Sequence, residues 1–433
     1  MYIIRFPVRT RDRVLVLLFL LTVITYLDRV CIGTMATAIS ADLGLSKTQM
    51  GAAFSAFILG YVLFEVPGGW LADRFGARLL LPRIVVWWSV FTAATAGAWS
   101  FGSLLAIRFL FGAGEAGAFP ACSTVVLRWF PRSERGRANG LLLTGSRLGG
   151  AVAPALVIGL MHSLGWRQTF LAFSLLGVLW SVMWYRWYRN RPEEHSGVTA
   201  AELEQIRQDS PPDAPASLDW RRLLRNRNLW ALCGMYSGYT YGLYFYLTWL
   251  PTYLREHRGL SWAGVGLGAA LPLLVGAAAN TLGGYGTDLL VRRLGLRWGR
   301  RLPAAAGLFA AAILLAIAAL TSNPVLSLAA LALSFGAADL ILPVCWATCI
   351  DLGKQNSGVV AGLMNSLGQV GGMLSPYLLG WLVERYGSWT LPLLISAAYY
   401  AVSGGLWFFI DAGQSLDESD PVDARRRGAL AAR

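Results

Sequence analysis

Four ionisable residues in the first third of the chain stand inside long apolar stretches. Asp28 and Arg29 interrupt one stretch, and Arg108 and Glu115 lie seven residues, or two helical turns, apart in another. If these stretches cross a membrane, each charge costs about 3 kcal/mol or more to bury and needs a partner or a wet cavity. The pattern therefore indicates either a functional charged site or a permanently paired structural network.

The chemistry of these residue types favours anion binding coupled to protonation. An arginine stays protonated and offers a planar fork of donors that suits a carboxylate. A substrate anion that competes with an acid for a guanidinium would free that acid to take up a proton. We therefore expect Arg29 and Arg108 to bind the anion. We expect Asp28 and Glu115 to couple its movement to protons.

The composition excludes an ordinary soluble enzyme. Of 433 residues, 55% are hydrophobic and only 14% are charged, which is typical of membrane proteins. The net charge of +13 resides in short arginine clusters between apolar runs, so the membrane topology explains it and nucleic-acid binding is not expected. The five cysteines lie in apolar segments without a CxxC pair. We expect them to be buried, and we predict no metal site, no cofactor and, without HExxH or GxxxxGK[ST] motifs, no zinc protease or ATP-driven pump.

Apolar stretches of spanning length fall into two groups of six. They lie at 14–38, 49–71, 80–99, 103–127, 137–162 and 168–188, and at 229–254, 263–290, 303–322, 325–350, 356–384 and 389–410. A bilayer crossing needs about 20 apolar residues, so we predict an all-α membrane protein with twelve transmembrane helices in two six-helix bundles. The predicted parts are a first bundle at 1–188, a cytoplasmic linker at 189–227, a second bundle at 228–411 and a cytoplasmic tail at 412–433.

Arginine and lysine are concentrated on one side of this topology, the side that holds the N-terminus, the linker and the tail. The positive-inside bias places that side in the cytoplasm. We expect the membrane to be the plasma membrane, the inner membrane of a bacterium. The first apolar stretch follows four arginines, as in a signal peptide, but it is too long and carries Asp28 and Arg29. We interpret it as a retained helix.

The two halves echo each other. Gly68, Gly69 and Asp73 reappear as Gly283, Gly284 and Asp288, and Gly150, Pro154 and Gly165 reappear as Gly372, Pro376 and Gly387. Such a duplication predicts two bundles around a central cavity that opens alternately to the two sides, as in a secondary carrier.

The loop that starts at Gly69 reads GWLADRFGAR, which resembles the GxLADRxGxR signature of the major facilitator superfamily. We expect Asp73 to lie near the positive end of a neighbouring helix, and Arg74 and Arg78 to pair with acids across the half. With Asp288 as the counterpart in the second half, these residues would form a latch that breaks when the cytoplasmic side opens. The alternative is that they are solvated loop charges that obey the topology rule.

Further motifs resemble the anion:cation symporter family within that superfamily. They are YLDR at 26–29, Tyr61 with PGG at 67–69, RFLFGAGEAGAFPA from Arg108, RWFPRSERGRA from Arg128, YFYLTWLPTYL from Tyr244 and GLMNSLGQVGGMLSP from Gly362. The family includes bacterial carriers of hexonates, hexuronates and glucarate. The resemblance implies that Asp28 and Glu115 are proton sites and that Arg29 and Arg108 contact the substrate carboxylate. We also expect Tyr26, Tyr61 and Tyr244, which lie in these motifs, to contact the substrate.

Three charges depart from the pattern of the better-known sugar-acid carriers. Glu65 stands where those carriers tend to have glutamine, Arg147 adds a cation to the fifth span, and Asp339 adds an acid to the tenth. Arg147 could recognise a second substrate carboxylate, as in an aldarate, or could pair with Glu65 or Asp339.

Polar side chains also fall within the second half. Five tyrosines, among them Tyr239 and Tyr244, crowd the seventh span, and their rings could face a polyhydroxylated substrate or pack helices. Asn365, Ser366 and Gln369 on the eleventh span could bind sugar hydroxyls or hydrogen-bond between helices.

The sequence thus predicts a secondary carrier, expected to be a monomer, that imports a small organic anion with protons, sodium being an alternative ion. A second hypothesis is efflux of a cationic or amphipathic compound with Glu65 and Asp339 as cation sites. A third is a sensor built on the same scaffold.

Overall fold

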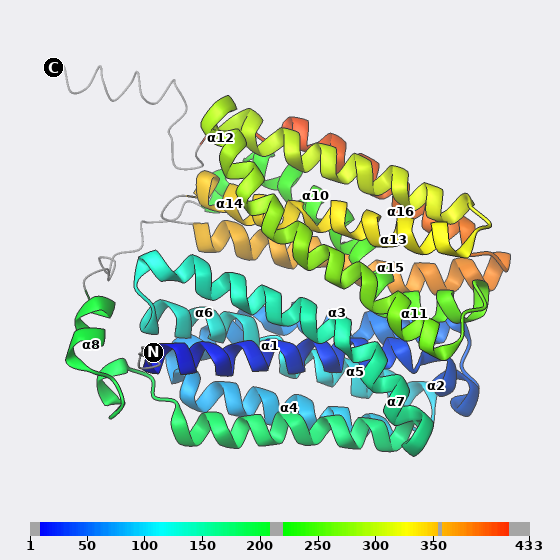
Figure 1. Ribbon diagram of the computed structural model, residues 1–433, viewed down its shortest axis with the longest axis horizontal. Coiled ribbons are helices and arrows are strands. Elements are labelled where there is room, and N and C mark those ends of the chain that lie inside the picture. The colour runs from blue at the N-terminus through cyan, green and yellow to red at the C-terminus, as the bar shows by residue number, and fades with distance from the viewer. Residues whose placement is uncertain (1–8, 208–219, 354–356, 415–433) are drawn as a thin grey trace, which may run out of the picture.

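The computed structural model describes residues 9–207, 220–353 and 357–414, and the described chain is helical without strands. Figure 1 shows two helical bundles packed against each other along their length. The first comprises α1 (Thr10–Thr34), α2 (Ala36–Leu43), α3 (Lys47–Phe75), α4 (Ala77–Ala96), α5 (Phe101–Glu115), α6 (Ala118–Trp129) and α7 (Arg132–Trp187). The predicted all-α membrane fold is confirmed.

The second bundle follows two short linker helices, α8 (Ala200–Arg207) and α9 (Trp220–Arg225). It comprises α10 (Arg227–Tyr244), η2 (Phe245–Trp249), α11 (Leu250–Thr252), η3 (Tyr253–His257), α12 (Trp262–Leu320), α13 (Pro324–Asp339), α14 (Ile341–Gly353), α15 (Ser357–Tyr386) and α16 (Thr390–Leu406). The segments η2 and η3 are π-helical turns, a feature that often accompanies functional sites.

Eight of the described helical segments are long and apolar enough to cross a membrane. Two of them, α7 and α12, are each a pair of helices joined at a glycine, Gly165 with φ 78° and Gly295 with φ 74°. The helix α15 and the run from α10 to η3 add two further elements of spanning length. This arrangement is compatible with the twelve predicted crossings.

The turns of the two halves repeat. The described glycines with positive φ are Gly44, Gly76 and Gly165 in the first half and Gly259, Gly295 and Gly387 in the second. Gly44 corresponds to Gly259, Gly76 to Gly295 and Gly165 to Gly387, and the two members of each pair lie at the same turn of their halves. A side chain strains this left-handed backbone, so glycine at these turns supports the duplication inferred from the sequence.

The two bundles touch closely at the end remote from the linker. There α3 packs on α15, and α7 packs on α12. A Cβ atom on Gly51 of α3 would lie 2.3 Å from the carbonyl oxygen of Pro376. A Cβ atom on Gly380 of α15 would lie 2.4 Å from the carbonyl oxygen of Lys47. Glycine is therefore required for the backbones to approach this closely.

Polar contacts between the bundles extend only part of the way toward the linker. At the remote end the backbone N–H of Thr48 donates to Glu384 at 2.8 Å. In the part of the chain that the structure describes, the interbundle hydrogen bond nearest the linker joins Glu65 to Asn365 at 2.6 Å. Glu65 lies ten residues before the end of α3, which is about 15 Å along the helix. Among the described residues, polar contacts thus join the two bundles at the remote end and do not continue to the linker end.

The linker helix α8 is anchored to the start of α1. Glu202 of α8 accepts the backbone N–H groups of Thr10 at 3.3 Å and Arg11 at 2.9 Å. The Arg11 side chain donates to Gln205 of α8 at 2.9 Å. Glu202 therefore satisfies free N–H groups at the first turn of α1, where the helix dipole favours a carboxylate.

Candidate functional site

Arg29, on α1, and Glu115, the last residue of α5, form a buried ion pair midway along the first bundle. Their side chains are 8% and 1% exposed. The Cζ atom of Arg29 lies 5.2 Å from the ring centre of Tyr26, 5.3 Å from that of Phe57 and 4.9 Å from that of Tyr61. The guanidinium is thus held between a carboxylate and aromatic faces, which attract a cation. The structure brings these predicted residues together.

Arg108 and Asp28 lie buried in the same bundle, at 3% and 2% exposure. The Cζ atom of Arg108 lies 5.0 Å from the ring centre of Phe57 and 4.7 Å from that of Phe111. Among the described residues, the two carboxylate oxygens of Asp28 have no hydrogen-bond partner. The Nε atom of Arg108 has none there either. A buried polar atom without a partner is costly, and a role in catalysis or ligand binding is one of the explanations for it.

Tyr244 and Gln369 bring polar groups from the second bundle. Tyr244 is 5% exposed, and its ring lies 2.6 Å from the ideal Cβ position of Gly372. The Oε1 atom of Gln369 lies 3.0 Å from that same position and has no hydrogen-bond partner among the described residues. The two predicted contacts therefore lie beside one glycine of α15, next to each other.

Glu65 joins the two bundles. The side-chain amide of Asn365 donates to Glu65 at 2.6 Å, and the hydroxyl of Ser366 donates to it at 3.3 Å. Asn365 was predicted to bind substrate hydroxyls or to hydrogen-bond between helices, and here it makes the interhelical bond.

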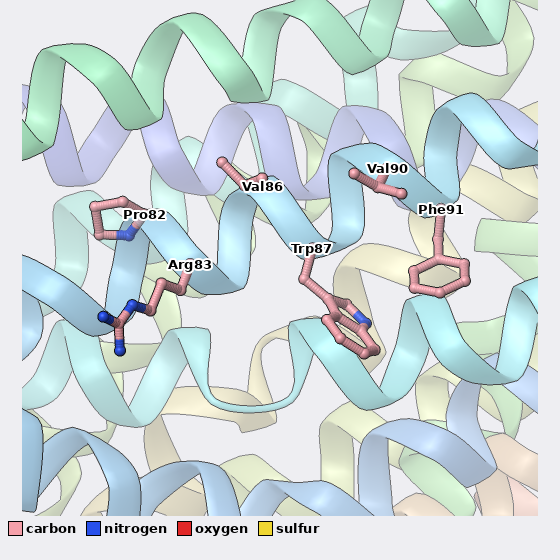
Figure 2. Close-up of a pocket in the computed structure, with 6 residues that line it drawn as sticks. All are labelled: Pro82, Arg83, Val86, Trp87, Val90 and Phe91. Atoms are coloured by element: carbon pink, nitrogen blue, oxygen red, sulfur yellow. The ribbon is translucent and has the colours of Figure 1, made fainter.

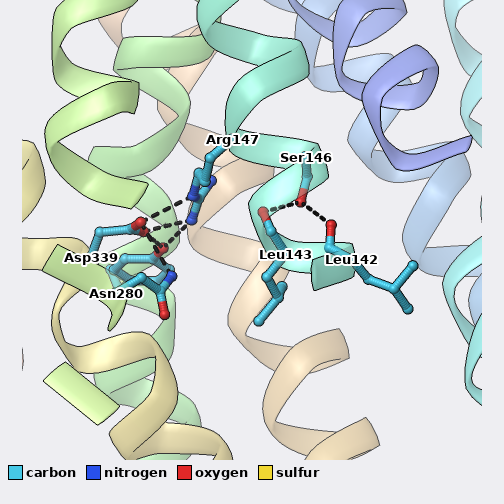
Figure 3. A network of polar contacts seen from close by, with 7 residues as sticks. Leu142, Leu143, Ser146, Arg147, Asn280 and Asp339 are labelled. Carbon is cyan, nitrogen blue, oxygen red and sulfur yellow. Dashed lines mark hydrogen bonds and ion pairs between the residues drawn. The ribbon is translucent and has the colours of Figure 1, made fainter. Parts of the chain in front are cut away.

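Arg147 and Asp339 form a second interbundle contact, between α7 and α13 (Figure 3). Arg147 donates from Nε to Oδ2 at 3.0 Å and from Nη2 to Oδ1 at 2.5 Å, so the pair is bidentate. Tyr239 donates its hydroxyl to Oδ1 of Asp339 at 2.6 Å. The side-chain amide of Asn280 donates to Oδ2 at 3.4 Å. Of the two acids predicted as partners of Arg147, it is Asp339 that contacts it in the structure.

The predicted latch residues differ from expectation. Arg74 lies over the ring of Trp70 at 5.1 Å, and Arg78 lies over the ring of Tyr185 at 5.4 Å. Neither makes an ion pair with an acid among the described side chains, so the latch that we expect from these residues stays a prediction. The side chain of Asp73 lies outside the described residues.

The glycine and acid of the latch pattern are placed as follows. Gly69 packs against the ring of Pro120, 3.6 Å from its ideal Cβ position. In the second half Asp288 forms an ion pair with Arg300, with 3.4 Å between Oδ1 and Nη1. Arg300 also pairs with Asp351, with 2.9 Å between Nε and Oδ2. Asp288 is therefore paired within its own bundle, whereas Arg74 and Arg78 of the first half make cation–π contacts.

Three residues of the site were not predicted in their observed roles. Phe57 lies four residues, one turn, before Tyr61 and shares its face of α3. Asn280 is a single amide in an otherwise apolar stretch, and such a polar side chain within a membrane span indicates a buried partner or a functional site. Tyr239 was noted among five tyrosines, and spacing alone does not distinguish the one that faces an acid.

Two grooves lie on the outer surface of the bundles. One, of about 500 Å³, is lined by Pro82, Arg83, Val86, Trp87, Val90 and Phe91 of α4 (Figure 2). The other, of about 520 Å³, lies where α3, α5 and α15 meet, with Phe109 and Tyr377 in its lining. Most of the side chains that line both are apolar, as suits a surface that faces lipid. The five cysteines are buried and unpaired.

Comparison with known proteins agrees with this architecture. The family model of the Major Facilitator Superfamily matches residues 18–376. The chain is 36% identical to the probable sulfoacetate transporter SauU of Cupriavidus necator, over 98% of this chain and 99% of the relative. It is 33% identical to the hexuronate transporter of Bacillus subtilis, over 88% and 90% of the two chains. It is 31% identical to the D-galactonate transporter of Escherichia coli, over 94% and 96%.

Among solved structures, the fold resembles a bacterial homologue of the human lysosomal transporter Spinster in an inward-facing and occupied conformation. The TM-score is 0.76 at 18% identity, over 95% of this chain and 99% of that one. The chain therefore belongs to the major facilitator superfamily of membrane transporters.

Proposed function

We propose that this protein imports a small organic anion, such as a hexonate, hexuronate or aldarate, together with protons. The observation that carries the proposal is the cluster of Arg29, Arg108, Asp28 and Glu115, four buried charges halfway along the first bundle. Only one close ion pair, between Arg29 and Glu115, is formed within it. Relatives named as carriers of hexuronate, galactonate and sulfoacetate support an organic anion as substrate.

The coupling step is a competition for the Arg29 guanidinium. An anion that binds Arg29 displaces the carboxylate of Glu115 from its cation. A carboxylate left without a cation in a buried site takes up a proton, and releases it when the cation returns. Asp28, whose oxygens have no described hydrogen-bond partner, is a second proton acceptor in the same cluster. Arg108 contributes a second guanidinium for the anionic group.

The proposed orientation places the linker in the cytoplasm of a bacterium, with the protein in the inner membrane as a monomer. The arginine clusters on the linker side support this orientation. Contacts between the bundles at the remote end then close the path to the outside. The described conformation is accordingly the one from which substrate leaves into the cell.

Export of a cation through Glu65 and Asp339 is less well supported. Asp339 is occupied by a bidentate arginine, and Glu65 accepts two hydrogen bonds from α15. Neither carboxylate is available to a cationic guest in this arrangement.

Uptake into proteoliposomes tests the proposal. Galactonate, glucuronate and sulfoacetate are supplied outside at acidic pH with a neutral interior, in the presence and absence of sodium. We expect accumulation driven by the proton gradient, and a loss of at least about 10-fold in Arg29→Lys and Arg108→Lys, because a bidentate guanidinium contact is removed. Arg83→Gln, on the outer groove of α4, is the matched control and should retain uptake. Uptake that ignores the proton gradient would remove the coupling, and the absence of uptake for all three anions would remove the anion claim.

A further inference from the structure

The Arg147–Asp339 pair joins the two bundles at mid-height and is almost fully buried. Its side chains are 6% and 0% exposed. It connects α7 of the first bundle to α13 of the second, as Figure 3 shows. A buried pair of this kind adds little stability over an apolar pair, because desolvation offsets the attraction. Its presence between two bodies that must move apart therefore points to a function beyond stabilisation.

The acid of the pair keeps donors without the arginine. Tyr239 donates to Oδ1 of Asp339 at 2.6 Å, and Asn280 donates to Oδ2 at 3.4 Å, both from the second bundle. If Arg147 turns away, the Asp339 carboxylate remains hydrogen-bonded on both oxygens. The guanidinium therefore can be released without leaving an entirely unsatisfied acid.

The arginine, by contrast, has unused donor capacity. Its Nη1 atom is buried and has no hydrogen-bond partner among the described residues. Its neighbour Ser146 donates to the backbone oxygens of Leu142 and Leu143 within α7, at 3.2 and 2.9 Å (Figure 3). Among the described hydrogen bonds, none joins the Ser146 hydroxyl to Arg147. A guanidinium with an unmet N–H in a buried interface suits an anionic group that offers two or more acceptor oxygens.

Tyr26 links this pair to the Arg29 cluster. Its ring centre lies 5.2 Å from Cζ of Arg29. Its Cδ1 atom lies 3.7 Å from the ideal Cβ position of Gly150, one turn beyond Arg147 on α7. One aromatic side chain thus separates the Arg29 cluster from the helical turn that carries Arg147.

We propose that Arg147 binds the second anionic group of a doubly charged substrate, a dicarboxylate or a sulfonated carboxylate. This inference rests on the proposed function, in which Arg29 and Arg108 bind the first anionic group. The second group displaces Asp339 from the guanidinium and so opens the ion pair that joins the bundles. A singly charged anion leaves the pair closed and gains nothing from Arg147. Dianions are therefore preferred over monoanions of the same skeleton.

Galactarate and galactonate test the proposal, because they share a carbon chain and differ in one terminal group. Dissociation constants are measured by titration calorimetry on the purified full-length protein. We expect wild type to bind galactarate at least about 10-fold more tightly than galactonate, as for a charge-assisted hydrogen-bonded contact. The double variant Arg147→Gln/Asp339→Asn removes both charges together, so that no unpaired charge stays buried. It should lose the preference and bind galactonate as wild type does. Ser146→Ala, the neighbouring change on α7, should keep the preference.

Asp339→Asn alone gives an independent readout, since it releases Arg147 from its acid. We expect it to bind galactarate as tightly as wild type or more tightly. A pair with a structural role alone predicts equal losses for both anions in this variant, and that result would overturn the proposal. So would a wild type that binds galactonate without preferring galactarate, or a double variant that keeps the preference. If wild type binds and transports neither anion nor sulfoacetate, the proposed function itself fails.

Discussion

Arg29 and Arg108 lie against the same aromatic ring. Their Cζ atoms are 5.3 and 5.0 Å from the ring centre of Phe57 on α3. Like charges repel at short range, and an aromatic ring in contact with both guanidiniums attracts each of them. Phe57 therefore holds in one place the two guanidiniums that we propose as the first anion site.

Phe57→Leu should weaken anion binding without uncoupling it from protons. The cation–π attraction at such sites is about 0.5–2 kcal/mol, so we expect the KM for the transported anion to rise about 2- to 30-fold. Dependence on the proton gradient should remain, because Glu115 and Asp28 are unchanged. The control is Phe54→Leu. Phe54 is a buried ring on the same helix that packs edge-on against Trp249, with 5.4 Å between the ring centres. Equal KM changes in the two variants would argue against the shared-ring role.

Neutral variants of the acids should separate exchange from accumulation. Glu115→Gln and Asp28→Asn cannot take up the coupled proton, but they leave Arg29 and Arg108 in place. We expect the proton gradient to lose most of its effect on uptake, while exchange of labelled against unlabelled anion continues.

Both measurements use the same proteoliposomes, and Asp42→Asn is the control. Asp42 pairs with Arg167 at 2.8 Å on the protein surface, with its side chain 46% exposed, where an ion pair contributes little. If Glu115→Gln and Asp28→Asn both accumulate anion as wild type does, neither acid carries the coupled proton.

The sequence was sufficient to locate the charged cluster but not to pair its members. A charge inside an apolar run is visible in one dimension because its cost of burial does not depend on the partner. Arg29, Arg108, Asp28 and Glu115 were found in this way, and the helical fold followed from run lengths. The partner of Arg147 could not be chosen between Glu65 and Asp339, because the choice depends on how the two bundles are rotated against each other.

The latch shows the second limit of sequence reasoning. Arg78 was expected to meet an acid, but it lies over Tyr185 and its Nε donates to the backbone oxygen of that residue at 3.5 Å. A carrier has at least two conformations, and one sequence pattern must serve both. The pattern therefore does not tell which partner Arg78 has in the described conformation.

Bulk at the remote end should block the conformation described here. In Gly380→Val the new side chain would meet the carbonyl oxygen of Lys47, which lies 2.4 Å from the ideal Cβ position. Because α3 and α15 cannot then approach, we expect uptake to fall at least about 10-fold while the protein still folds, since close-packed helices tolerate little added volume. At Gly362 on the same helix, no atom beyond the chain neighbours and the adjacent backbone of the helix itself lies within 4 Å of the ideal Cβ position, so Gly362→Val should transport normally. Similar uptake by both variants would mean that this contact is not needed in the cycle.

Glu202 should contribute to stability although it lies 192 residues after Thr10, the first residue of the helix that it caps. It accepts the N–H groups of Thr10 and Arg11 and is 6% exposed, so its removal leaves two buried donors without their acceptor. We expect Glu202→Ala to destabilise the purified protein by about 1–3 kcal/mol, seen as a lower apparent Tm. Glu204→Ala, two residues further along α8 at an exposed position, should leave the Tm nearly unchanged, because surface substitutions have small effects. If the two variants melt alike, α8 is only loosely associated with α1, and the linker does not anchor the first bundle.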